Sequence, residues 1–89
     1  MKLKRGYKVR EVAGNYMLLP YGEESINFNC VFSMSESAAW LWNVLQDKEF
    51  NESEALSLIL GEYDVDEVTA LNDVRSVIRS WKENGVLDE

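Results

Sequence analysis

Hydrophobic residues recur every three or four positions along residues 33–45, which is the spacing of an amphipathic helix. The broadest apolar stripe of this segment consists of Met34, Ala38, Leu41, Trp42 and Leu45. Trp40 and Val44 form a second stripe beside it. A helix with two apolar stripes must be covered on two sides, so we expect it to be the central helix, with Trp40 and Trp42 in the core.

The polar residues before this stripe predict where the central helix begins. Ser33 together with Glu36 fits a capping box, in which side chains satisfy the first free amides of a helix. Ser35 is an alternative cap. The central helix is therefore expected to start just after Ser33 or just after Ser35.

Two further helices are expected after the central one. Asn51 opens a second capping pattern before an apolar run, and Gly61 is expected to close that helix or its last turn. Asp66 is expected to cap a third and longer helix, which Asn84 and Gly85 would end. The apolar positions of this third helix, again three or four apart, are Leu71, Val74, Ile78 and Trp81.

The N-terminal part of the chain has the pattern of strands. Residues 8–12 and 16–20 hold β-branched and aromatic residues on either side of a Gly14-Asn15 turn signal, which predicts a hairpin. A third strand is predicted at residues 26–32, with Phe28, Cys30 and Phe32 on one face and Asn27, Asn29 and Val31 on the other. The predicted fold is α+β, a three-stranded antiparallel sheet followed by three helices (βββααα), in a single domain over residues 1–89.

Composition removes most kinds of catalytic and metal site. The 89 residues include no histidine, and the single cysteine, Cys30, lies on the apolar face of its predicted strand. Zinc sites and serine or cysteine triads cannot be assembled from the usual residues, and one small core leaves little room for an enclosed active site. We therefore expect no enzyme activity, no metal and no cofactor.

The sequence also favours a cytoplasmic protein without a membrane segment. A lone cysteine cannot form an internal disulfide, and no apolar run follows the basic N-terminus to make a signal peptide. No apolar stretch approaches the roughly 20 residues that a helix needs to span a bilayer.

Charge is distributed unevenly along the chain. The net charge is −7, but residues 1–46 carry five basic and four acidic side chains, whereas residues 47–89 carry four basic and twelve acidic ones. Such an acidic C-terminal half should repel the backbone of a nucleic acid. We therefore expect no nucleic-acid partner.

Two surfaces are candidates for binding. If the strands pair in sequence order, residues 26–32 lie at the edge of the sheet, where free backbone groups can pair with another strand. The third helix carries a basic stripe beside its apolar face, consisting of Arg75, Arg79 and Lys82. Such a stripe is usually a solvated helix face, and its functional alternative is a groove that takes an acidic and apolar peptide.

Several segments, taken with this order of elements, resemble the PqqD-like family. They are residues 34–42 at the start of the central helix, 62–64, 73–74 and the closing 81–87. The resemblance covers nearly the whole chain. This sequence departs from the family pattern, which has Leu, Asn, Thr and Leu, at Met34, Ser35, Ser37 and Trp81, and each replacement keeps the size class or the capping role.

The resemblance implies a winged helix-turn-helix-like domain that recognises peptides during ribosomal peptide modification. The leader of a precursor peptide would add as a strand between the third strand and the third helix, and would be presented to a modifying enzyme, often a radical SAM protein. Together with the edge strand and the helix stripe, the resemblance predicts these peptide-binding residues: Asn27, Asn29, Val31, Ser33, Leu71, Val74, Arg75, Ile78, Arg79 and Lys82.

Two other functions compete with peptide capture. A winged-helix DNA-binding protein would place the third helix in the major groove, with Arg75, Arg79 and Lys82 on phosphates or bases. A homodimeric assembly protein would pair its edge strand with that of a second copy. The net charge of −7 counts against DNA binding, while the sequence leaves the homodimer open.

Overall fold

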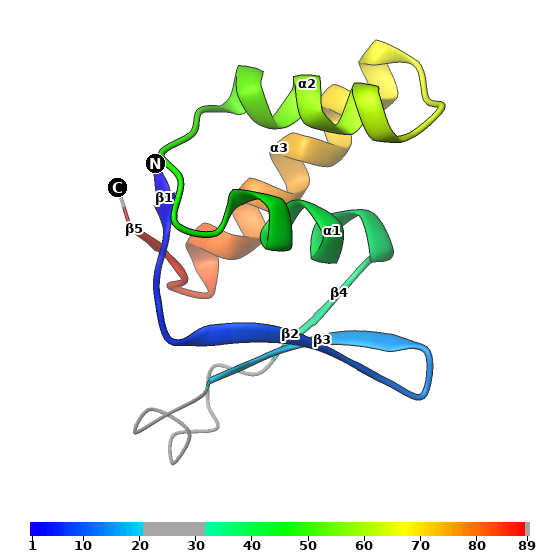
Figure 1. Cartoon of the computed structure of the whole chain (residues 1–89). Coiled ribbons are helices and arrows are strands. Elements are labelled where there is room, and N and C mark those ends of the chain that lie inside the picture. The colour runs from blue at the N-terminus through cyan, green and yellow to red at the C-terminus, as the bar shows by residue number, and fades with distance from the viewer. Residues whose placement is uncertain (21–31, 89) are drawn as a thin grey trace.

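The computed structural model describes residues 1–20 and 32–88. Within them a three-stranded antiparallel sheet is followed by three helices, the α+β arrangement that the sequence predicts (Figure 1). A second sheet, of two short strands, lies where the two ends of the chain meet (Figure 1). The elements in order are β1 (Lys2–Leu3), β2 (Tyr7–Val12), β3 (Asn15–Pro20), β4 (Phe32–Met34), α1 (Glu36–Leu45), α2 (Glu52–Glu62), α3 (Glu67–Glu83) and β5 (Leu87–Asp88).

The predicted hairpin is confirmed as β2 and β3, paired from Tyr7 with Pro20 to Val12 with Asn15. The turn consists of Ala13 and Gly14, which have positive φ angles of 52° and 84°. Positive φ at both central residues is typical of the tight turn whose twist matches that of the flanking strands. Asn15 is therefore the first residue of β3 and not part of the turn.

The strand order β2-β3-β4 places β4 at one edge of the sheet. β4 pairs with β3 through Tyr16 with Met34, Met17 with Ser33 and Leu18 with Phe32. Of the predicted third strand, only Phe32 belongs to the described residues, and Asn27, Asn29, Cys30 and Val31 lie outside them.

The central helix starts at Glu36, so the Ser33 capping box is wrong and the alternative cap is right. Ser35 Oγ accepts a hydrogen bond from the Ala38 amide at 3.2 Å. Ser33 cannot cap the helix because it and Met34 continue the strand and pair with β3. Met34 therefore leaves the apolar stripe of the helix, although it still packs against the core.

The core is centred on two tryptophans, Trp42 of α1 and Trp81 of α3, which are 0% and 1% exposed. Their rings meet edge to face, with centroids 5.3 Å apart and planes at 84°. The prediction of a buried Trp42 is thus confirmed. Trp40 is only half-buried: it packs against the rim of the core and meets the ring of Tyr63 edge to face at 5.8 Å.

The predicted caps of α2 and α3 are confirmed. The Asn51 side chain accepts from the Glu54 amide at 2.8 Å, and the Asp66 carboxylate accepts from the Thr69 amide at 3.0 Å. At the other end of α3, Gly85 has a φ of 73° and its amide donates to the Lys82 carbonyl, which is a Schellman ending.

Gly61 lies in the last turn of α2, one of the two places that the sequence predicts for it, but it does not end the helix. The helix continues to Glu62, and the Tyr63 amide donates to the Ile59 carbonyl at 2.9 Å. Gly61 is exposed and does not adopt the positive φ that favours glycine after a helix, so it is tolerated as an ordinary helical residue. The helix ends instead because the next residue, Tyr63, has an extended backbone conformation.

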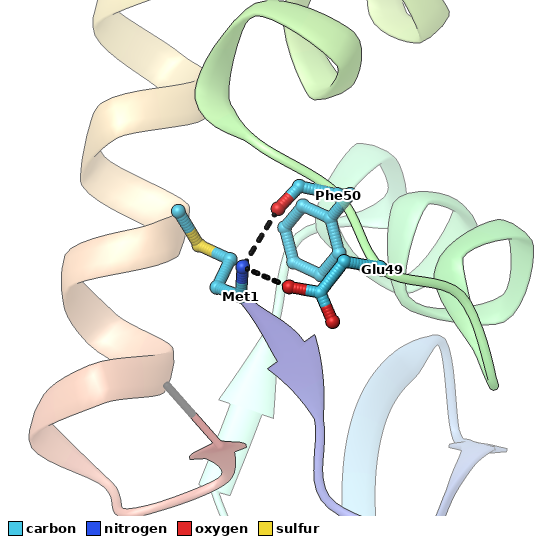
Figure 2. Close-up of polar contacts among 3 residues, drawn as sticks. All are labelled: Met1, Glu49 and Phe50. Carbon is cyan, nitrogen blue, oxygen red and sulfur yellow. Dashed lines mark hydrogen bonds and ion pairs between the residues drawn. The ribbon is translucent and has the colours of Figure 1, made fainter.

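The sequence did not predict β1 and β5, whose antiparallel pairing joins Leu3 to Leu87. The chain's first residue is also bound to the link between α1 and α2. The Met1 amino group lies 3.0 Å from Glu49 Oε1 and 2.9 Å from the Phe50 carbonyl oxygen (Figure 2). Strands of two residues are too short to show an alternating pattern, so no sequence signal marks them.

Candidate functional site

A groove lies between the edge strand β4 and helix α3, where a volume of about 140 Å³ is open to solvent. Its strand side is formed by Ser33 and Met34, followed by Ser35 and Ala38 at the start of α1. Its helix side is formed by Ser76, Val77, Ser80 and Trp81. We call these residues the β4–α3 groove.

A larger hollow of about 320 Å³ continues from one end of the groove. The two depressions share Ser35, Ala38 and Val77, so they are neighbouring parts of one surface. The hollow is lined by Ser35, Glu36, Ser37, Ala38, Leu41, Ile59, Tyr63, Val65, Asp73, Val74 and Val77. We call it the α1–α3 hollow.

The walls of the groove are held in place by contacts through the core. Trp81 Nε1 donates to Met34 Sδ at 3.4 Å, which ties β4 to the C-terminal half of α3. Trp81 is in turn packed against Trp42 of the central helix. At the hollow, the ring of Trp40 supports the ring of Tyr63. Four of the residues that line the groove are serines with short side chains, two on the β4 side and two on α3.

Negative charge gathers at the hollow and not in the groove. The residues that line the groove carry no charge, whereas Glu36 and Asp73 both line the hollow. Burial raises the pKa of the Tyr63 hydroxyl, and the carboxylates of Glu36 and Glu62 raise it further. The Glu11 carboxylate raises the pKa of Tyr16, with smaller contributions from burial and from Glu36. The charge of Glu36 therefore acts on Tyr16 of β3 and on Tyr63, the residue that follows α2.

A family model decides what kind of protein this is. The model for the coenzyme PQQ synthesis protein D (PqqD) matches residues 16–87. The chain belongs to the PqqD family. The matched residues include every described residue of the groove and of the hollow, so this surface lies within the PqqD domain. No match was found among curated proteins.

Two solved structures share the fold of this PqqD-family chain. One is TbiB1 in complex with the TbiA(beta) leader peptide, with 20% identity, a TM-score of 0.69 and coverage of 99% of this chain and 95% of that chain. The other is lasso peptide synthetase B1 complexed with the leader peptide, with 23% identity, a TM-score of 0.62 and coverage of 94% and 92%.

The structure brings two of the described predicted residues to this surface, and they come from opposite walls. Ser33 lines the groove, and Val74 lines the hollow. Asn27, Asn29 and Val31 lie outside the described residues.

The other predicted residues of α3 are not among those that line the groove or the hollow. The Arg75 guanidinium binds the Glu52 carboxylate, so it is directed toward α2. Ile78 packs against the core and Leu71 is half-buried. Arg79 and Lys82 are exposed.

The wall that α3 presents to β4 was missed as a site because its residues are small and mostly uncharged. Asp73, Ser76, Val77 and Ser80 are spaced three and four apart and so share one helix face. The signal that could have found them is this run of short side chains on a helix whose other faces carry long ones. Short side chains on one face allow another chain to approach the helix closely.

The described residues hold no group of three or more histidine, cysteine, aspartate or glutamate side chains placed to bind a metal ion. Nor is any helix among these residues long and apolar enough to cross a membrane.

Proposed function

We propose that this PqqD-family chain is a non-catalytic peptide-binding module, a peptide chaperone for the leader of a ribosomally made precursor peptide. The leader would add as a strand to β4, lie in the β4–α3 groove and be presented to a modifying enzyme, for which a radical SAM protein is our candidate. The observation that carries the proposal is the groove beside β4, the edge strand of the sheet in the described residues, in a fold shared with two proteins solved with leader peptides.

Backbone pairing along β4 would supply much of the affinity. Each residue of an antiparallel strand directs its N–H and C=O to the same side, so either Ser33 or the pair Phe32 and Met34 faces the free edge. So short a stretch offers few hydrogen bonds. We therefore propose that the preceding positions Asn27, Asn29 and Val31 extend the strand that the leader pairs with.

Contacts with helix α3 would determine which side chains of the leader are accepted. We propose Val74, Ser76, Val77 and Ser80 as its direct contacts, because they line the groove or the hollow. The remaining predicted residues lie elsewhere around the helix, and we propose that they meet the modifying enzyme or the leader where it leaves the groove. These residues are Leu71, Arg75, Ile78, Arg79 and Lys82.

We propose that this capture takes place in the cytoplasm, as expected from the single cysteine. Homodimerisation through β4 would use the same strand edge as the leader, so the two would compete. DNA binding through α3 is not favoured, since Arg75 is already paired with Glu52 and the net charge is −7.

The test is a titration of fluorescently labelled leader peptides, synthesised from each small open reading frame found beside this gene. Ser76→Trp fills the groove, and Ser57→Trp makes the same change at an exposed position of α2 outside it. We expect the Ser76 variant to lose at least about tenfold in affinity, the scale of deleting one well-packed contact, and the Ser57 variant to bind normally.

Duplex DNA of random sequence and size-exclusion chromatography complete this test. Equal binding of the leader by both variants would exclude the groove as its site. Tighter binding of DNA than of the leader would favour the DNA-binding alternative, and a dimer that the leader does not dissociate would favour the assembly protein.

A further inference from the structure

We infer that the α1–α3 hollow selects peptides that carry a lysine or arginine next to the apolar side chain it receives. This inference rests on the proposed function and adds to it the chemical class of peptide that the chain prefers. The hollow has an apolar floor, which would receive the apolar side chain, and an acidic rim, which would bind the lysine or arginine.

The floor of the hollow comes from the core of the protein. Ala38, Leu41, Ile59 and Val74 line it and are each at most 6% exposed. These residues belong to α1, α2 and α3, so the floor is where the three helices meet. A volume of about 320 Å³ lies at the small end of the roughly 300 to 1,000 Å³ range of ligand pockets. It suits one large apolar side chain of a peptide and not a whole folded element.

The rim of the hollow is acidic. Glu36 and Asp73 are the charged residues among its lining, and both are exposed. Glu36 stands at the start of α1 and Asp73 on α3, so the two carboxylates come from different elements. Neither has a hydrogen bond or ion pair with any of the described residues.

Of the two depressions, only the α1–α3 hollow has charged residues in its lining. The lining of the β4–α3 groove is uncharged, while Glu36 also raises the pKa of Tyr63 at the hollow and of Tyr16 on β3. Arg75, one of the predicted cations of α3, is bound to Glu52 on α2. A peptide that passes from the groove over the hollow therefore encounters negative charge, not the basic stripe.

A peptide that covers the hollow removes water from the two carboxylates. Loss of water is unfavourable for a charge unless a partner of opposite sign replaces it. A lysine or arginine of the peptide supplies that partner, whereas an aspartate or glutamate at the same place adds repulsion. The hollow thus favours basic peptides and also rejects acidic ones, which makes it a source of specificity.

The experiment selects peptides from a random display library on the full chain and on a variant with Glu36→Gln and Asp73→Asn. A second variant, with Glu54→Gln and Asp88→Asn, removes the same charge away from the hollow and serves as the control. We expect the unchanged chain and the control to enrich lysine or arginine beside a large apolar residue. The hollow variant should keep the apolar preference and lose the basic one.

The best selected peptide is then tested against the unchanged chain with its basic residue replaced by Gln and by Glu. We expect about two- to fivefold weaker binding for Gln, more for Glu, and smaller differences at high salt, because exposed charges are screened. This arm needs no protein variant, so it holds even if a substitution disturbs folding.

The outcomes separate the inference from the proposed function. Selected peptides that compete for the groove but show no basic preference would overturn the inference and leave peptide capture standing. No selected peptide sensitive to Ser76→Trp would overturn both. Equal loss of the basic preference in the hollow variant and the control would assign the selection to net charge and not to the hollow.

Discussion

The two central tryptophans are equally buried but differ in one hydrogen bond, which leads to a quantitative prediction. Trp42 and Trp81 are 0% and 1% exposed, and each packs on the other. Trp81 Nε1 donates to Met34 Sδ, whereas Trp42 Nε1 is buried with no hydrogen-bond partner among the described residues. Replacing each by phenylalanine removes a similar part of the ring but a different polar contact.

The expected magnitudes follow from these contacts. Each substitution loses buried ring surface and leaves a small void, which costs roughly 1 to 3 kcal/mol. Trp42→Phe also removes an unpaired buried donor, which relieves about 1 to 3 kcal/mol, while Trp81→Phe loses a weak hydrogen bond worth about 0.5 kcal/mol. We therefore expect Trp42→Phe to be more stable than Trp81→Phe by about 2 kcal/mol.

Phenylalanine is a better replacement than alanine for this comparison, because alanine removes the whole aromatic ring. Trp42→Ala should cost about 3 to 5 kcal/mol. A domain of this size has a free energy of unfolding of roughly 4 to 13 kcal/mol, so such a variant can lose its fold and give no number. Lys48→Ala, at an exposed position in the link between α1 and α2, should stay within about 0.5 kcal/mol of the parent.

The assay is urea unfolding followed by far-UV circular dichroism, since a fluorescence signal would itself change with the tryptophans. With a slope near 1 to 2 kcal/mol per molar urea, the two phenylalanine variants should differ in midpoint by about 1 M or more. If Trp42→Phe unfolds at the same midpoint as Trp81→Phe, or below it, the unpaired indole donor is not the cost that we assign to it.

Three further predictions concern local geometry. Ala13→Asn should raise the free energy of unfolding by roughly 0.5 to 1 kcal/mol, because asparagine adopts positive φ more readily than alanine; an unchanged urea midpoint would contradict the turn described here. Ser35→Ala should cost about 1 kcal/mol in thermal unfolding and Ser33→Ala much less, and the reverse order would restore the Ser33 cap. The pKa of Asp66 is lowered from its ordinary value of 3.8, chiefly by hydrogen bonds from Thr69. The stability that the ionised Asp66 carboxylate adds is therefore present above pH 3.8 and is lost as the pH falls through the lowered pKa. Asp66→Asn keeps a hydrogen-bond acceptor that does not titrate, so the melting temperature of this variant should decline less steeply below about pH 4.

The helices could be predicted from the sequence because their signals are local. Spacing identified the apolar faces, and side-chain caps at Asn51 and Asp66 marked where α2 and α3 begin. At α1 two serines competed for the same role, and spacing could not choose between them. The choice is made by a contact distant in sequence, the pairing of Ser33 with Met17 across the sheet.

The candidate site was harder to predict because it depends on which way each helix is turned. The edge strand followed from the strand order, and Ser33 and Val74 do face the groove and the hollow. Sequence spacing gives the residues that share a face of α3 but not the element that each face meets. Arg75 meets α2 because Glu52 is there to bind it, and that partner lies 23 positions earlier in the chain.

The pairing of β1 with β5 has a consequence for the order in which the protein folds. Leu3 and Leu87 lie almost the whole chain apart, and closing so long a loop in an unfolded chain costs about 4 kcal/mol of entropy. Contacts of this range form readily only after nearer ones have shortened the loop. The helices should therefore pack first, and the two chain ends should join last. During synthesis the lining of the β4–α3 groove, within residues 33–81, is made before β5, so this groove can form before β1 has found its partner strand.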